Sequence, residues 1–94
     1  MLDQTSMDAL YKACQNKLQV VVNYMKKTTG EFVTHTGGVQ EINSGEGIIW
    51  LWDTQRNDSI RKFYIANIQG IEVLNIPYVG NGYPIKIDGQ ELGF

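Results

Sequence analysis

Aromatic and basic side chains lie close together in the middle of the chain, at a spacing suited to binding a nucleobase and its phosphate. Trp50 and Trp52 are two positions apart, so in a strand they point to the same face. Arg61, Lys62 and Tyr64 follow in one short segment. Aromatic rings stack on bases, which contributes about 1–3 kcal/mol per base, and cations contact phosphates. The plainer interpretation is that one or both tryptophans fill the core, which suits a chain this small.

The net charge restricts the nucleic acids that such a surface can bind. Eight basic residues stand against ten acidic residues, which gives a formal net charge of −2. A protein that binds duplex DNA usually carries a basic surface, because neutralising phosphates supplies much of its affinity. Only local basic pairs are available here, so we expect a nucleotide or a short single strand as the ligand. The expected ligand-binding residues are Arg61, Lys62, Trp52, Tyr64, Lys26 and Lys27.

The remaining titratable side chains form no catalytic or metal-binding pattern. His35 and Cys14 are the only histidine and the only cysteine, so the paired ligands of a zinc site are missing. We expect His35 on the surface. Asp53 and Asp58 flank a predicted turn, where Asp usually accepts hydrogen bonds from backbone amides rather than performing acid–base chemistry. We therefore predict a protein that is not an enzyme and that holds no metal or cofactor.

The hydrophobic pattern predicts one helix followed by strands, within the single domain that 94 residues allow. Apolar residues at helical spacing predict a helix over 4–16. Alternating patterns rich in β-branched residues predict strands, and the pair Gly37–Gly38 predicts a bulge or bend in the second strand. A single helical turn is expected over 66–70. The predicted strands are 17–25, 31–36 with a continuation to 42, 48–53, 60–65 and 71–76.

The last part of the chain, residues 77–94, is predicted to be a β extension. Asp88-Gly89 between two short apolar runs is a strong two-residue hairpin signal. An isolated hairpin is barely stable in water, so this one must pack on the domain or on a neighbouring subunit. Aromatic residues are enriched in interface cores. We therefore expect a homo-oligomer with Tyr78, Tyr83 and Phe94 at its interface, and the alternative is that these side chains pack within their own chain.

The predicted five-strand meander with one helical turn before the last strand matches an SH3-like barrel, and residues 9–74 resemble a WYL-type domain. A helix leads to a strand ending in tyrosine over Ala9–Tyr24, and a basic turn with glycine follows over Lys26–Gly30. An aromatic strand then ends at an aspartate over Ile49–Asp53. The family's last motif reads arginine, any residue, phenylalanine, arginine, leucine, aspartate, arginine and isoleucine. In Arg61–Ile68 the first arginine, the phenylalanine and the final isoleucine match, while tyrosine and asparagine replace two arginines.

This resemblance extends to the small SH3-barrel proteins of bacteriophages and gut bacteria, and it implies a fold and a class of function. The implied fold is mainly β: a small five-stranded SH3-like barrel with an N-terminal helix over residues 1–76. The hairpin predicted from the turn signals adds a C-terminal β extension of the same domain over residues 77–94. The implied function is non-enzymatic binding of a nucleotide or a short single-stranded nucleic acid. A viral protein of this kind would sequester a host signalling nucleotide.

The alternative function is a structural or protein-interaction module that self-associates through its C-terminal extension. No apolar run approaches the ~20 residues that span a bilayer, and a single cysteine forms no disulfide within the chain. We therefore expect a cytoplasmic protein without a membrane partner.

Overall fold

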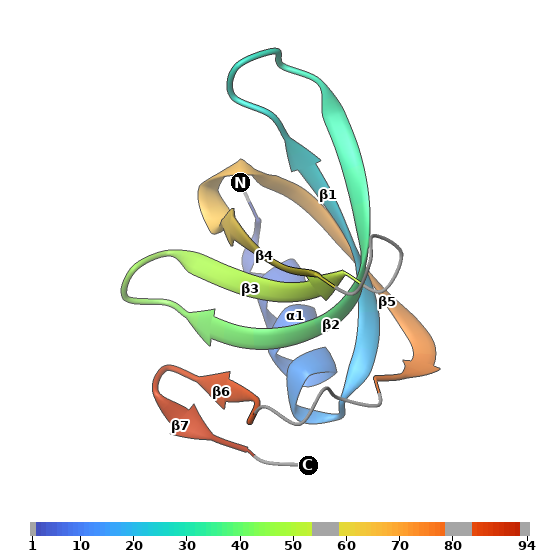
Figure 1. The fold of residues 1–94 in the computed structure, drawn as a ribbon, viewed down its shortest axis with the longest axis vertical. Helices are drawn as coiled ribbons and strands as arrows, with labels where there is room; N and C mark the ends of the chain where they lie inside the picture. The colour runs from blue at the N-terminus through green and yellow to red at the C-terminus, as the bar shows by residue number, and fades with distance from the viewer. Residues whose placement is uncertain (1, 54–58, 79–83, 93–94) are drawn as a thin grey trace.

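The computed structural model describes residues 2–53, 59–78 and 84–92, in which one helix packs against a mainly antiparallel sheet (Figure 1). The helix is capped by Asp3, whose carboxylate accepts a hydrogen bond from the Ser6 amide at 2.8 Å. The elements are α1 Gln4–Gln15, β1 Leu18–Met25, β2 Phe32–Asn43, β3 Ile48–Asp53, β4 Ser59–Tyr64, the 3₁₀ turn η1 Ile65–Asn67, β5 Ile68–Pro77, β6 Lys86–Ile87 and β7 Gln90–Glu91.

The strand order is β4-β3-β2-β1-β5, so consecutive strands pair from β1 to β4 and the chain then returns to place β5 beside β1. The turn η1 makes that return, which confirms the predicted helical turn before the last strand. Among the described residues β4 and β5, at the two ends of this order, do not pair. The mainly β fold and the N-terminal helix are therefore confirmed, and closure of the sheet into a barrel stays a prediction.

The core lies between α1 and one face of the sheet. On β3 the buried face carries Ile49, Leu51 and Asp53, which are all inaccessible to solvent. Trp50 and Trp52 lie on the opposite face and are only partly buried, so neither is a fully buried core residue, although Trp52 packs against the core. Side chains from the helix and from all five long strands complete the core: Leu10, Ala13, Cys14, Val20, Val22, Val39, Ile42, Phe63 and Ile68.

The glycine pair in β2 allows close packing rather than a bulge. A Cβ on Gly38 would overlap the ring of Tyr78, and one on Gly37 would overlap the backbone of Trp52. The irregularity in the β2–β3 pairing comes later, between Val39 and Glu41. There Val39 and Gln40 are both buried although they are consecutive, as a bulge permits.

The described part of the C-terminal segment packs within its own chain. Tyr78 is 4% exposed and Ile85 is fully buried in the core. The Tyr78 hydroxyl donates to Gln40 Oε1 at 2.6 Å, and burial raises the pKa of this phenol, which keeps it protonated as a donor. Tyr78 was expected as an exposed interface aromatic, and its burial corrects that expectation. Tyr83 and Phe94 lie outside the described residues.

The predicted hairpin at the C-terminus is confirmed. Asp88 and Gly89 have φ values of +49° and +85°, which suits the two-residue turn between β6 and β7. Strand β6 runs parallel to the end of β2, pairing with Glu41 and Ile42 beyond the part of β2 that pairs with β1. The Asp88 carboxylate also accepts hydrogen bonds from the amide and hydroxyl of Ser44. The hairpin therefore extends the sheet of its own chain.

Candidate functional site

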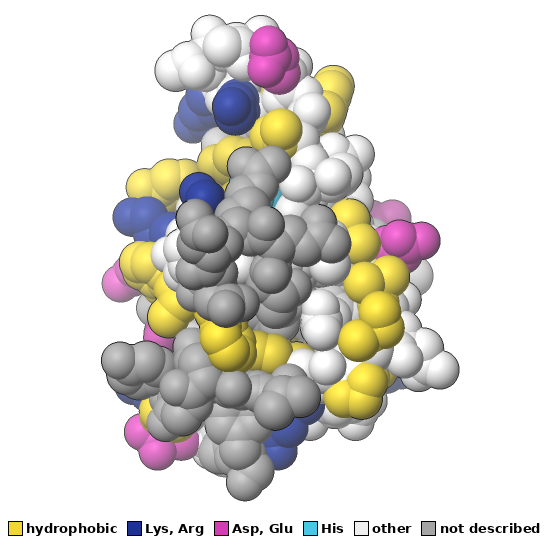
Figure 2. Space-filling model, turned by 45° about the vertical axis from the view of Figure 1, so that its right-hand side comes forward, with side chains coloured by type: hydrophobic (Ala, Val, Ile, Leu, Met, Phe, Trp, Pro, Cys, Tyr) yellow, Lys and Arg dark blue, Asp and Glu magenta, His cyan; other side chains and the backbone are white. Residues whose placement is uncertain are grey.

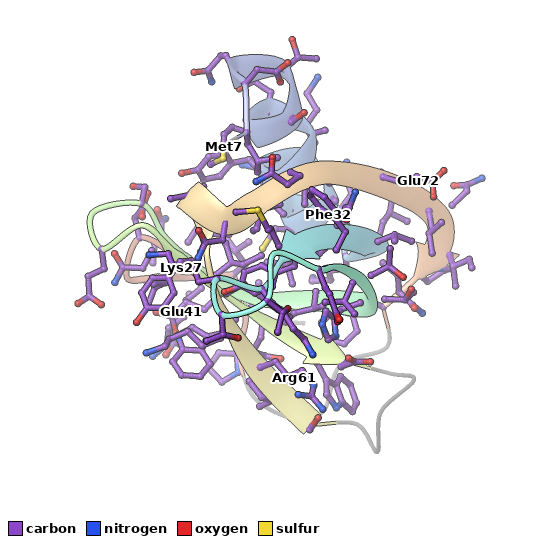
Figure 3. All side chains as sticks on the ribbon, turned by 90° about the horizontal axis from the view of Figure 1, so that it is seen from above. Met7, Lys27, Phe32, Glu41, Arg61 and Glu72 are labelled. Atoms are coloured by element: carbon purple, nitrogen blue, oxygen red, sulfur yellow. The ribbon has the colours of Figure 1, made fainter. Side chains whose placement is uncertain are left out.

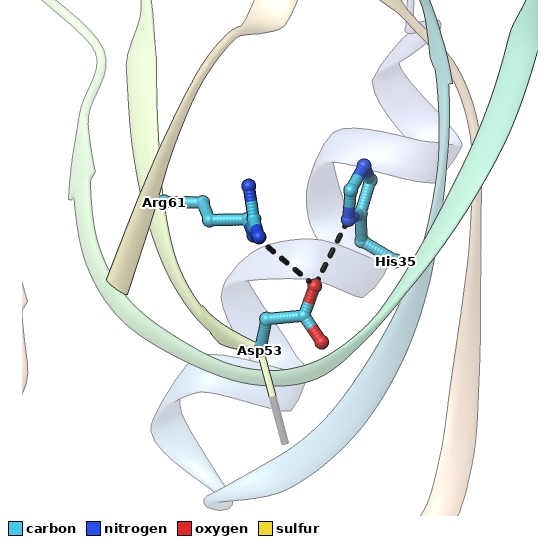
Figure 4. A network of polar contacts seen from close by, with 3 residues as sticks. All are labelled: His35, Asp53 and Arg61. Carbon is cyan, nitrogen blue, oxygen red and sulfur yellow. Dashed lines mark hydrogen bonds and ion pairs between the residues drawn. The ribbon is translucent and has the colours of Figure 1, made fainter. Parts of the chain in front are cut away.

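Three polar side chains from three neighbouring strands meet on the inner face of the sheet (Figure 4). His35 on β2 places Nδ1 2.9 Å from Asp53 Oδ2, and Arg61 on β4 places Nε 3.5 Å from the same oxygen. Asp53, at the end of β3, has no exposed surface, and His35 is 7% exposed. The expectations of a surface histidine and of an aspartate exposed in a turn are both wrong. Asp58 lies outside the described residues.

The electrostatics of this group follow from the complete burial of Asp53. A buried carboxylate is costly unless cations or hydrogen-bond donors compensate it. Here His35 supplies a hydrogen-bond partner and Arg61 supplies a positive charge. The Arg61 contact is a charge contact rather than a good hydrogen bond, since Nε is buried without a hydrogen-bond partner. The Arg61 side chain as a whole is 42% exposed, so the group reaches the surface.

The His35 ring is oriented by its partner, since Nδ1 lies 2.9 Å from Asp53 Oδ2. When the Asp53 carboxylate is ionised it can only accept, so this hydrogen bond then requires a proton on Nδ1. A neutral ring in that tautomer has Nε2 as an acceptor. The Phe63 ring packs against the His35 ring with centroids 4.9 Å apart. The Tyr24 ring in turn packs edge-on against Phe63 with centroids 4.8 Å apart. The imidazole is therefore held by both packing and a hydrogen bond.

A second cluster lies on the outer face of β3 and β4. Lys62 pairs with Trp50 across the two strands, and its Nζ lies 5.9 Å from the Trp50 ring and 5.3 Å from the Tyr64 ring. Tyr64 is 48% exposed, and Ile60 on the same face is 43% exposed. We call Trp50, Lys62 and Tyr64 the outer cluster. It offers a solvent-facing aromatic surface with a cation over it.

A groove of about 300 Å³ adjoins the outer cluster and shares Trp50 with it. The end of β2 and the residues before β6 form its other walls. Its lining residues are Gln40, Glu41, Trp50, Ile60, Pro84 and Lys86.

The structure separates the residues predicted to bind one ligand. Arg61 lies opposite Leu51 on the inner face, whereas Lys62 and Tyr64 alternate with it and lie outside. Trp52, also outside, packs edge-on against Tyr78 with centroids 5.3 Å apart. Arg61 therefore shares no strand face with Trp52 or Tyr64, and a grip of these residues on one small ligand stays a prediction.

The predicted basic pair Lys26–Lys27 belongs to a different part of the molecule. Both residues are exposed in the turn between β1 and β2, which projects from the body of the protein. Figure 3 shows Lys27 at this turn. In the same view Arg61 on β4 lies at the side of the molecule opposite Met7 of α1. The pair is available to solvent but forms no part of either cluster described above.

Sequence reasoning missed the contact between His35 and Asp53, because the contact depends on the register of the β2–β3 hairpin. The register of the β2–β3 hairpin pairs Gly37 with Asp53, which brings His35 within reach of the carboxylate. Successive side chains in a strand point to opposite faces, so Arg61 and Lys62 on β4 lie on different faces of the sheet.

Comparison with known proteins gives no match, since no protein family, no curated protein and no solved structure is significantly similar to the chain. Within residues 2–53, 59–78 and 84–92, histidine, cysteine and carboxylate side chains form no cluster of three that could hold a metal ion. In the same part of the chain, α1 is too short and too polar to cross a bilayer.

Proposed function

We propose that this protein is a non-enzymatic binding module for a nucleotide or a short single-stranded nucleic acid, and that the outer cluster is its stacking surface. The observation that carries this proposal is the position of Lys62 over the rings of Trp50 and Tyr64. A base that stacks on the half-exposed Tyr64 ring meets a cation beside it, which is the arrangement that sequence-tolerant single-strand binding uses.

The surroundings of the outer cluster support the same function. Strand β4 lies at one end of the strand order, and Ile60 and Tyr64 on its outer face are 43% and 48% exposed. The adjoining groove continues from the shared Trp50, and its lining combines the apolar Ile60 and Pro84 with the charged pair Lys86 and Glu41. The proposal includes the fold: the meander and the turn η1 support a small SH3-like barrel of the kind seen in WYL-type domains. In a viral setting the same surface would sequester a host nucleotide.

Tyr64→Ala tests the stacking surface directly. Binding of a fluorescently labelled single-stranded oligonucleotide, measured by anisotropy, should weaken about 5- to 150-fold, the equivalent of roughly 1–3 kcal/mol for one lost stack. Phe32→Ala is the matched control, because Phe32 is an equally large aromatic that is 62% exposed on another strand. Lys62→Ala should also weaken binding, with Lys12→Ala on α1 as its control. Equal losses in the variant and control of each pair would contradict the proposal.

A second candidate function, self-association, is favoured by the surface of β5. Val73 is 39% exposed and Ile76 is 50% exposed, and among the described strands β5 pairs only with β1. Figure 2 shows hydrophobic side chains gathered along the side of the molecule that β5 occupies. An exposed apolar edge strand is a template for pairing with a second chain.

The oligomeric state distinguishes this second function. Ile76→Lys should convert an oligomer to a monomer in sedimentation or light-scattering measurements over a concentration series. Leu92→Lys, at a residue 37% exposed beside β7, is the control that should leave the oligomer intact. A wild-type protein that is monomeric at all concentrations would exclude self-association.

A further inference from the structure

We propose that His35 and Arg61 together form a binding site for the terminal phosphate of a phosphomonoester, with Asp53 as the residue that positions both. This site lies on the inner face of the sheet, whereas the outer cluster lies on the opposite face. It therefore stands independently of the stacking surface.

The geometry around Asp53 directs two groups to one place. Asp53 Oδ2 contacts His35 Nδ1 at 2.9 Å and Arg61 Nε at 3.5 Å. Figure 4 shows the ring and the guanidinium on either side of the carboxylate, and in this view one ring nitrogen of His35 and one guanidinium nitrogen of Arg61 lie farther from it than the atoms that contact it. The guanidinium carries further N–H donors beyond Nε. A ligand that reaches both side chains meets donors from Arg61 and the second ring nitrogen of His35.

The arrangement is poor as a purely structural ion pair. Arg–carboxylate pairs that serve stability are commonly bidentate, with two parallel hydrogen bonds. Here Nε faces the carboxylate at 3.5 Å, and it is the buried side-chain atom that lacks a hydrogen-bond partner in the described part of the chain. Burying a donor in this way costs free energy, whereas the exposed end of Arg61 remains available to a ligand.

The class of ligand follows from the His35 tautomer that pairs with an ionised Asp53 carboxylate. In that tautomer the proton is on Nδ1, and a neutral ring presents Nε2 as an acceptor. A phosphomonoester has a second pKa near 6, so close to neutral pH it can carry one P–OH group beside its anionic oxygens. The P–OH donates to Nε2 while the anionic oxygens accept from Arg61. If the shared proton instead resides on Nε2, then Nε2–H donates a hydrogen bond to an oxygen of the fully ionised phosphate. The complex contains the same number of protons in either arrangement.

Other anions lack this match. A phosphodiester has no ionisable P–OH group, and a carboxylate at neutral pH has no proton to share, so each would set an acceptor against Nε2 unless the ring took up a proton from solvent. We therefore expect discrimination between a phosphomonoester and a phosphodiester.

His35 reports directly on this site because it is the only histidine of the chain. In a long-range ¹H–¹⁵N spectrum of the full chain, its ring signals should shift in a saturable way on titration with inorganic phosphate and with adenosine 5′-monophosphate. Adenosine should cause no such shift, and adenosine 3′,5′-cyclic monophosphate should bind at least tenfold more weakly. Tighter binding of the 5′-monophosphate than of inorganic phosphate would identify a nucleotide as the source of the phosphate, and equal binding would identify free phosphate. No saturable shift with either, or equal affinity for the cyclic diester, would overturn the proposal.

Substitutions separate a binding role from a structural one. Arg61→Gln should weaken phosphate binding at least tenfold while the His35 ring signals of the free protein stay close to those of the wild type. Lys12→Gln on the exposed face of α1 is the matched control for loss of one positive charge. Asp53→Leu removes the acceptor of the His35 hydrogen bond, so it should change the tautomer of His35, which the ¹⁵N shifts of its ring nitrogens report, together with the affinity. If this buried variant fails to fold, the wild-type titration and Arg61→Gln still decide the question, since Arg61 is 42% exposed. Unchanged affinity in Arg61→Gln would contradict the proposal.

Discussion

Replacing Ile85 by alanine tests whether the C-terminal segment is part of the core or an arm for a partner. Ile85 is fully buried and belongs to the same hydrophobic cluster as α1 and the long strands. The change removes three carbon atoms, which costs roughly 2.4 kcal/mol at about 0.8 kcal/mol per buried CH₂. Any cavity that remains adds to this cost, within the roughly 2–5 kcal/mol typical of such substitutions. For a domain of this size the expected fall in melting temperature is about 10–20 °C.

Urea unfolding followed by tryptophan fluorescence measures this loss. Trp52 reports on the segment, because its ring packs against Tyr78. Leu92→Ala is the matched control: Leu92 follows the same hairpin but is 37% exposed, so its truncation should cost less than about 1 kcal/mol. If both variants unfold at the wild-type urea concentration, the segment does not contribute to the core. The reasoning from burial would then be refuted, and association through the C-terminal extension would become the favoured function.

Three further predictions concern the inside of the fold. Gly38→Ala should destabilise the protein by about 1–3 kcal/mol in the same assay, because its Cβ would overlap the ring of Tyr78, and an unchanged midpoint would show that this contact is absent. Burial raises the pKa of the Cys14 thiol from 9.0 to about 12, so at pH ~8 a thiol reagent should react about a thousandfold more slowly with the native chain than with the unfolded chain. Equal reaction rates in the native and unfolded states would contradict the burial of Cys14. The free energy of unfolding should also fall as the pH rises from 9 toward 12, because the thiol of the unfolded state loses its proton at a lower pH than the native thiol. A double-mutant cycle of His35→Ala and Asp53→Ala, measured by urea unfolding at neutral pH, should give a coupling of roughly 1.5–3 kcal/mol, and additive effects would show that the hydrogen bond contributes nothing.

Much of the secondary structure was predictable because its signals are local. The strand predicted over 48–53 is β3 with the same bounds, and the predicted helix over 4–16 differs from α1 by one residue. The Asp88-Gly89 turn was also predictable, because a two-residue hairpin turn needs residues that tolerate positive φ. Period and turn chemistry act over a few residues, so they can be read without knowing the partners of a strand.

The candidate sites were predicted less well because they depend on which face of each strand is buried. Trp50 and Trp52 were correctly placed on one face, but the apolar character of both faces of β3 gave no means of choosing between them. Once Ile49 and Leu51 face the helix, Arg61 must lie inside with them and Lys62 outside. That choice divided one predicted ligand site between two surfaces.

The sequence by itself determined the order of the elements, the positions of the turns and the pairs of side chains that share a face, since these follow from backbone preferences over short stretches. Only the tertiary structure decided which faces form the core, and with that the burial of Asp53 between His35 and Arg61 and the inclusion of Tyr78 and Ile85 in the core. The physical reason is that burial results from packing between segments distant in the chain. A strand with two apolar faces satisfies its own pattern equally well in either orientation, so only its neighbours can fix which face is inside.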